Sequence, residues 1–350
     1  MREGYHNLHI ITVDGQDRIY EDGGILYEDG VITHVGDRAY IEGKAKELYI
    51  ELKDGKGRYL FPGLINTHTH LYQDIMKGMG SDLSLEEWFP KSMAPAAGWG
   101  ASTGLLRATR EYADRNDTPV MMHMFETGTD DAISRERNGK SAIRHYEETG
   151  LLGPGLLAVH SVAIGEEEIR AYARNQVSVS YNPIANMYLA SGVAPVGEML
   201  KAGITVAIGT DGAGSNNDND MLEAMKFGAL LQKTFHKDPL AMTAGGMLRM
   251  ATIEGARALG MDRITGSVEE GKKADFFLFD PSKSVKSCPV HDIVATLIYS
   301  GDHKAVDTVV INGNTVLEDG RFLLADEKEI LDDAQLMADD LVRCIQENQG

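Results

Sequence analysis

The chain has 350 residues, of which 43% are hydrophobic and 25% are charged, a composition typical of globular proteins. This composition excludes a disordered, collagen-like or disulfide-framework protein, and at roughly 150 residues per domain the length predicts about two domains. The formal net charge is −19 and the basic residues form no cluster, so we expect no nucleic-acid partner.

The sequence also carries no sign of a membrane or secreted protein. No apolar run is long enough to span a membrane, and the N-terminus lacks the apolar stretch of a signal peptide. The two cysteines, Cys288 and Cys344, lie far apart, which excludes a cysteine-based zinc site and fits a reducing compartment. We therefore expect a cytoplasmic protein with no membrane partner.

Residues 1–58 consist of short β-rich runs separated by Asp/Gly turns, with no helical periodicity between them. The runs cover 9–14, 24–30 and 30–36. Similar runs recur after residue 274, where Asn312-Gly313-Asn314 has the sequence of a hairpin turn. The two blocks, 1–58 and 274–325, predict one small β-sandwich domain formed by both termini.

Residues 59–273 instead alternate between strand-like and helix-like runs. The strand-like runs cover 59–68, 119–125, 155–162, 177–183 and 204–211. The helix-like runs cover 102–116, 141–150, 166–176, 196–203, 221–235 and 242–260. Because the strands are almost continuously apolar, they predict a buried parallel sheet. The long series of units favours a (β/α)8-type TIM barrel over an open sheet.

Residues 326–350 have an acidic, amphipathic pattern that predicts a C-terminal helix. We expect this helix to pack on its own domain, with a homodimer contact as the alternative.

Polar side chains follow the predicted barrel strands at their carboxyl ends, where barrel enzymes place their active sites. The candidates are His68, His70, His123, Glu126, His160 and Asp211. His68 and His70 are two residues apart, so in a strand both imidazoles point to the same side. Histidines together with one aspartate suit Zn²⁺ or Fe²⁺ with an open position for water. The pattern predicts a metal site that generates hydroxide at neutral pH.

Several longer motifs resemble the amidohydrolase superfamily. They are PGLINTHTH (62–70), HMFET (123–127), AVHS (158–161), YNPIANMYLASG (181–192), GTDGAGSNNDNDMLEAMK (209–226) and GSVEEGKKADFFLFD (266–280). They are most similar to its branch of cytosine and guanine deaminases, methylthioadenosine/S-adenosylhomocysteine deaminases and triazine chlorohydrolases. The resemblance covers nearly the whole chain and implies a metal-dependent barrel with a β-sandwich domain made from both termini.

The resemblance also implies a role for each candidate residue. Four of them would be ligands of one divalent ion, namely His68, His70, His123 and Asp211. The ion would be zinc, with iron as the alternative. The resemblance makes Glu126 the acid that carries a proton to a ring nitrogen, and His160 the residue that steadies the attacking water. Asp211 can also serve as the base that takes a proton from this water. No lysine stands at a strand end before His123, where binuclear relatives have one, which favours a single ion.

The implied function is hydrolytic deamination of a small heteroaromatic substrate of purine, pyrimidine, pterin or triazine type. A triazine chlorohydrolase, with the same ion and a different leaving group, is the first alternative. The stretch 87–97 carries alanines where adenosine-type deaminases have a glutamate that binds the ribose. The sequence therefore does not select one substrate within the branch.

The predicted barrel is shorter than eight βα units require. The runs at 59 and 119 start 60 residues apart, and the resemblance makes them the first and fifth strands. Four units of roughly 30 residues need about 120, so about 60 residues or more are lacking near Ala96–Gly100. If the segment is deleted, an inactive metal-binding barrel is the second alternative function.

We favour the other explanation, in which the native chain has further residues at this point. An open set of five units would expose apolar strand edges. Consecutive Cα atoms somewhere between Trp88 and Ser102 should then lie much farther apart than the ~3.8 Å of a trans peptide.

Overall fold

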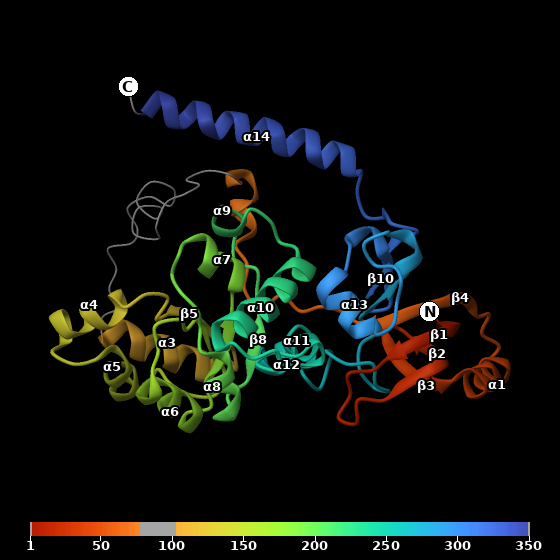
Figure 1. Ribbon diagram of the computed structural model, residues 1–350, viewed down its shortest axis with the longest axis horizontal. Coiled ribbons are helices and arrows are strands. Elements are labelled where there is room, and N and C mark those ends of the chain that lie inside the picture. The colour runs from red at the N-terminus through yellow and green to blue at the C-terminus, as the bar shows by residue number, and fades with distance from the viewer. Residues whose placement is uncertain (1, 78–102, 349–350) are drawn as a thin grey trace. The chain divides into compact units, whose positions relative to one another are not determined.

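A computed structural model describes residues 2–77 and 103–348, and the chain divides into two compact units (Figure 1). The first, here called the terminal unit, combines Met1–Ile65 with Met261–Gly350. The second, the central unit, is Asn66–Gly260. The predicted junction near 96–100, the alanine stretch at 87–97 and the expected Cα gap between 88 and 102 lie outside the described residues.

The terminal unit contains one eight-stranded sheet with the order β12-β11-β10-β9-β4-β1-β2-β3. Its N-terminal strands are β1 Arg2–Ile11, β2 Ile19–Glu28, β3 Val31–Asp37 and β4 Lys53–Pro62. Its C-terminal strands are β9 Phe276–Phe279, β10 Val306–Ile311, β11 Asn314–Glu318 and β12 Arg321–Phe322. Strands β4 and β9 pair antiparallel, so both ends of the chain contribute to the same sheet.

The core of the terminal unit shows how this sheet is shaped. The sequence predicts a sandwich, whereas hydrogen bonds join all of these strands into one sheet. The Phe276 ring on β9 contacts the Tyr27 ring on β2 at a centroid distance of 5.8 Å, although two strands separate β9 from β2 in the sheet order. The sheet therefore curls around an apolar core, which buries these large side chains.

Helix α1, Arg38–Leu48, corrects the expectation that no helix interrupts residues 1–58. Ile41 and Ala45 lie one turn apart on its buried face and pack with Leu26 of β2. Gly43 in the middle of the helix weakens the amphipathic pattern, which is why the sequence does not reveal it. A second helix, α13 Ile293–Ser300, lies between strands β9 and β10 in the sequence. Two short 3₁₀ turns flank it, η3 Pro281–Lys283 and η4 His303–Ala305.

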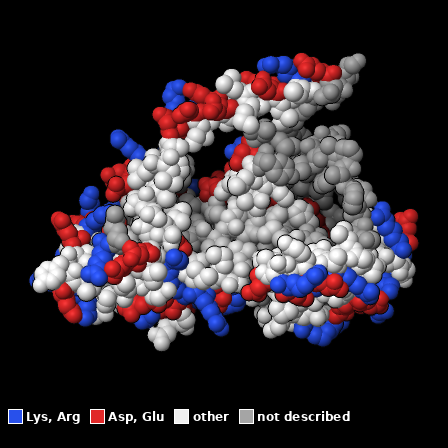
Figure 2. All heavy atoms as spheres, turned by 180° about the vertical axis from the view of Figure 1, so that it is seen from behind, with Lys and Arg blue, Asp and Glu red and all other residues white. Residues whose placement is uncertain are grey.

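The long C-terminal helix α14, Glu327–Asn348, has large apolar side chains that remain exposed. Leu331 and Leu336 are both 63% exposed. The packing of this helix on its own domain stays a prediction. On the face shown in Figure 2, acidic and basic side chains are interspersed. Among the helices within 2–77 and 103–348, none has the length and apolar character needed to cross a membrane.

The central unit contains a parallel sheet with the order β5-β6-β7-β8, which confirms the predicted alternation of strands and helices. Its strands are β5 Val120–Met124, β6 Leu156–His160, β7 Ser178–Tyr181 and β8 Val206–Ile208. The longer helices are α3 Thr103–Asn116, α4 Thr129–Asn138, α5 Ala142–Thr149, α6 Glu166–Arg174 and α10 Met221–His236. The shorter ones are η1 Leu71–Met76, α7 Pro183–Tyr188, α8 Val196–Lys201, α9 Ala213–Asn216, α11 Ala244–Met250 and α12 Ile253–Ala258.

The predicted first barrel strand, 59–68, is divided between the two units. Strand β4 ends at Pro62 in the terminal sheet, and one further bond follows it, from the Gly63 N–H to the Asp275 carbonyl (3.0 Å). The chain then runs beside β8, where the Thr67 N–H donates to the Ile208 carbonyl (3.2 Å) and the Asp211 N–H donates to the His68 carbonyl (2.9 Å). The boundary therefore lies between Ile65 and Asn66, and a short paired segment takes the place of the first strand.

Candidate metal centre

The carboxyl ends of the parallel strands bring the candidate side chains to one edge of the central sheet. His123 is the penultimate residue of β5, and His160 is the last residue of β6. Asp211 follows β8, beside the short segment that carries His68. Left-handed backbone at His160 (φ 74°) and Asp211 (φ 63°) turns the chain where these side chains must point into the site.

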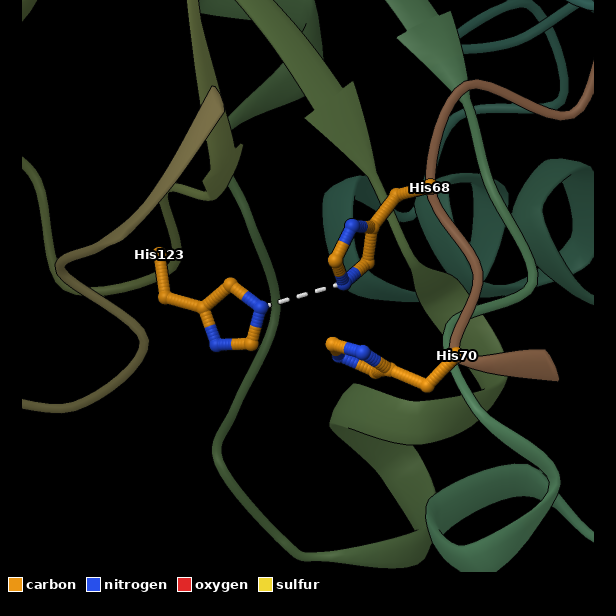
Figure 3. Close-up of side chains that lie close together, drawn as sticks. All are labelled: His68, His70 and His123. Carbon is orange, nitrogen blue, oxygen red and sulfur yellow. Dashed lines mark hydrogen bonds between the residues drawn. The ribbon is translucent and has the colours of Figure 1, made fainter. Parts of the chain in front are cut away.

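Four of the candidates converge on one point. The Nε2 atoms of His68 and His123 lie 3.1 Å apart, as the dashed line in Figure 3 shows. Oδ1 of Asp211 lies 3.2 Å from Nε2 of His68 and 3.3 Å from Nε2 of His70. The ring of His70 lies beside the other two imidazoles in Figure 3.

These separations fit a small, tetrahedrally coordinated divalent ion. With bonds of 2.0–2.1 Å, two ligand atoms of such a site lie about 3.3 Å apart. Hydrogen bonding alone does not account for all of these contacts. Nε2 of a neutral His68 has either one proton or one lone pair, yet it faces both Nε2 of His123 (3.1 Å) and Oδ1 of Asp211 (3.2 Å). A second observation points the same way: Nε2 of the buried His160 has no hydrogen-bond partner among the described residues.

Asp211 is buried and held as an anion. Its Oδ1 accepts a hydrogen bond from the Gly212 N–H (2.8 Å), and its Oδ2 accepts one from the Ser215 hydroxyl (3.1 Å). Burial alone would raise the pKa of Asp211, but the hydrogen bond with His68 and the other nearby imidazoles hold it well below its ordinary value. A carboxylate that stays ionised near neutral pH can serve both as a metal ligand and as a base.

Three of the histidines, His70, His123 and His160, are shifted toward the neutral form, which is the form that binds a metal. Burial lowers the pKa of His70 and of His160. Burial also lowers the pKa of His123, and the neighbouring imidazoles of His160 and His68 lower it further. Nδ1 of His160 lies 2.9 Å from Oδ1 of Asn186; with Nδ1 protonated, Nε2 is left with a free lone pair.

Glu126 differs from Asp211 in its protonation. Burial raises the pKa of Glu126 to about 7, and the negative charge of Asp211 adds to the rise. Its Oε1 accepts a hydrogen bond from the Ser191 hydroxyl (3.1 Å), which opposes the rise, and its Oε2 lies 3.5 Å from Nε2 of His160. A carboxyl group with a pKa near 7 can both take up and release a proton under ordinary conditions.

The structure thus brings all six candidates together and adds residues that the sequence reasoning missed. Asn186 and Ser191 contact His160 and Glu126, and Met121 places its sulfur 3.2 Å from Nδ1 of His68. The buried Gln73 accepts a hydrogen bond from the Gly214 N–H and so joins η1 to the Asp211 loop. Asn186 and Ser191 both belong to the motif YNPIANMYLASG, but nothing in its spacing identifies which side chains face the site.

The sequence matches the model of the amidohydrolase family over residues 89–316. A 5-methylthioadenosine/S-adenosylhomocysteine deaminase from Desulforudis audaxviator is 31% identical, over 99% of this chain and 100% of that protein. A 5′-deoxyadenosine deaminase from Methanosarcina barkeri is 29% identical, over 96% of this chain and 97% of that protein. The alignment with the Desulforudis protein spans 436 positions against 350 residues here, so at least 86 positions have no counterpart in this chain.

Solved structures agree on the fold. An adenosine deaminase from Xanthomonas campestris with bound zinc has a TM-score of 0.89 and 24% identity, covering 97% of this chain and 98% of that one. An atrazine chlorohydrolase from Arthrobacter aurescens complexed with zinc has a TM-score of 0.87 and 22% identity, covering 96% and 100%. The chain therefore belongs to the amidohydrolase family, as a hydrolase that acts on carbon–nitrogen bonds other than peptide bonds.

Proposed function

We propose that the protein is a metal-dependent deaminase that hydrolyses the exocyclic C–N bond of an amino-substituted nitrogen heteroaromatic ring. The convergence of three histidines and Asp211, with Glu126 and His160 beside them, is the observation that carries this proposal. The names of the relatives support an adenosine-type purine as the first substrate to test.

One divalent ion, zinc or iron, would be held by His68, His70, His123 and Asp211. Such an ion supplies Lewis acidity and brings the pKa of a water molecule toward 7. The ligand set of imidazoles with one carboxylate suits both metals, and the absence of a lysine ligand in the sequence supports a single ion.

Asp211, Glu126 and His160 then carry out or assist the proton transfers. Asp211, which stays ionised, takes a proton from the water that attacks the ring carbon bearing the amino group. Glu126 gives a proton to the adjacent ring nitrogen, which makes that carbon more electrophilic. His160 orients the attacking water through Nε2. Asp211 then gives the proton it took from the water to the amino nitrogen. The C–N bond breaks, ammonia leaves, and a hydroxyl or oxo group stands in place of the amino group.

We also propose that the positions lacking relative to the relatives lie between η1 and α3. The segment at Thr67–His68 runs beside β8, as a first strand beside an eighth would in a closed barrel. Strands β5 to β8 follow one another along the chain and in the sheet. Only residues 77–102 connect η1 to α3, fewer than the roughly 30 that a single βα unit needs.

The experiment is a substrate screen of the purified, zinc-loaded protein. The panel contains 5′-deoxyadenosine, 5′-methylthioadenosine, adenine, guanine, cytosine, an aminopterin-type ring and a chlorinated aminotriazine, with ammonia and chloride measured separately. We expect ammonia release from an adenosine-type compound. Chloride release without ammonia would favour the chlorohydrolase. Stoichiometric zinc without either product would favour an inactive metal-binding protein.

A further inference from the structure

The turn that ends α7 has an unusual feature beside the site. The Ser191 N–H donates to the Asn186 carbonyl (2.8 Å), and the Ala190 N–H donates to the Met187 carbonyl (3.1 Å). This pair of bonds is a Schellman motif, whose left-handed position is most often glycine. Here it is Ala190, with φ 55°, so a side chain is tolerated in a backbone conformation that costs free energy.

The turn places Asn186 and Ser191 in contact with His160 and Glu126, which lie beside the proposed metal ligands. From inside α7, Asn186 contacts Nδ1 of His160 at 2.9 Å. From the end of the turn, the Ser191 hydroxyl donates to Oε1 of Glu126 at 3.1 Å. Because the Ser191 N–H bonds to the Asn186 carbonyl, the two contacts are joined through one rigid turn.

We propose that Ser191 is a positioning residue for Glu126 and that the α7 turn sets the geometry of Glu126 and His160 together. The hydroxyl occupies Oε1 and leaves Oε2, the oxygen 3.5 Å from Nε2 of His160, to exchange its proton with the substrate. This inference rests on the proposed deaminase function.

A serine hydroxyl suits this task because it serves both protonation states of Glu126. It donates to the carboxylate and, by rotating, accepts from the protonated acid. The backbone of Ser191 already closes the turn, so the side chain is not needed for the Schellman motif. Removing the hydroxyl should therefore affect Glu126 and leave α7 in place.

The test compares Ser191→Ala and Ser191→Thr with wild-type protein, using the best adenosine-type compound of the panel. The matched control is Ser134→Ala, which removes the hydroxyl of a buried serine elsewhere in the central unit, one that accepts a hydrogen bond from Asn138 (3.4 Å). Steady-state kcat and KM, bound zinc and the midpoint of thermal unfolding are measured for each.

We expect Ser191→Ala to lower kcat about tenfold, the effect of losing one hydrogen bond to a charged group, while KM and bound zinc stay unchanged. Ser191→Thr keeps the hydroxyl and should restore most of kcat, and Ser134→Ala should equal wild type.

Each other outcome overturns a distinct claim. Wild-type protein that releases no ammonia from any compound contradicts the proposed function itself. With active wild type, an unchanged kcat in Ser191→Ala, or a raised KM at unchanged kcat, overturns the positioning role. Loss of zinc or of thermal stability in parallel with kcat would mean that the hydroxyl acts on the fold alone, and failure of Ser191→Thr to restore kcat would exclude the hydroxyl as the cause.

Discussion

Glu126 and Asp211 are two buried carboxyl groups of one site whose surroundings move their pKa values in opposite directions. Burial next to an anion raises the pKa of Glu126 to about 7, whereas hydrogen bonds and imidazoles keep Asp211 ionised. Glu126→Gln is isosteric but cannot exchange a proton. We expect it to retain the metal and to lose about 10²-fold or more in kcat, measured as ammonia release with zinc content determined in parallel. Near-normal turnover would rule out the proton-transfer role.

His68 is the most central of the proposed ligands, since it contacts both His123 and Asp211. His68→Ala should therefore lower bound zinc well below one equivalent, measured by elemental analysis after gel filtration. His303→Ala serves as the control, because that imidazole is 78% exposed in the terminal unit. An unchanged stoichiometry in His68→Ala would remove it from the ligand set.

Asp14 gives a pH prediction that is independent of the metal. Burial would raise its pKa, but hydrogen bonds from the Arg18 N–H (3.1 Å), the Arg18 side chain and the Gln16 N–H (3.0 Å) lower it. The folded state thus favours the ionised form, and the stability gained is present above pH ~4 and lost as pH falls further. Asp14→Asn should lower the free energy of unfolding by about 1–2 kcal/mol at pH 7.

The deficit of Asp14→Asn should shrink as the pH approaches 3, in denaturant titrations at several pH values. Glu51→Gln, an exposed carboxyl in the same unit, should show no comparable loss. A loss in the free energy of unfolding of Asp14→Asn that stays constant from pH 7 to pH 3 would contradict the assignment of Asp14 as an ionised carboxylate.

At the scale of elements, the approach of the His68 segment to β8 depends on a glycine. A Cβ on Gly209 would lie 2.5 Å from Oδ1 of Asn182 and 3.0 Å from the His68 backbone nitrogen. Gly209→Ala should therefore separate the segment from β8 and lower the free energy of unfolding by about 1–3 kcal/mol. Gly245→Ala in α11, where a Cβ meets nothing within 4 Å, should be neutral or slightly stabilising. Equal unfolding midpoints for the two variants would contradict this account.

The strongly periodic elements were predictable from the sequence, and the exceptions have identifiable causes. Runs such as 155–162 and 221–235 became β6 and α10, since continuous apolar strands and amphipathic helices leave clear patterns. The prediction of one barrel strand over 59–68 was wrong, because the strand ends at Pro62 in the terminal unit and the chain enters the central unit only at Asn66. The partners of the site could not be predicted, because Ser191 reaches Glu126 only through a left-handed turn at Ala190.

At the scale of the whole molecule, the account predicts that the native protein is longer than 350 residues. An eight-stranded barrel has no open edge, whereas the chain has too few residues between η1 and α3 to supply the remaining strands. We expect intact-mass spectrometry of the native protein to show a mass larger by about 60 residues or more, as the further βα units of an eight-unit barrel require. A mass equal to that of 350 residues would show a true deletion and favour the inactive metal-binding protein.

The central claim is that a single ion at His68, His70, His123 and Asp211 is required for hydrolysis of a ring C–N bond. The most direct test titrates metal-free protein with Zn²⁺ while ammonia release from the adenosine-type substrate is followed. The account predicts that activity is absent without the ion, rises in proportion to added Zn²⁺ and stops rising at one equivalent. Ammonia release by the metal-free protein, or a rise that continues to two equivalents, would contradict it.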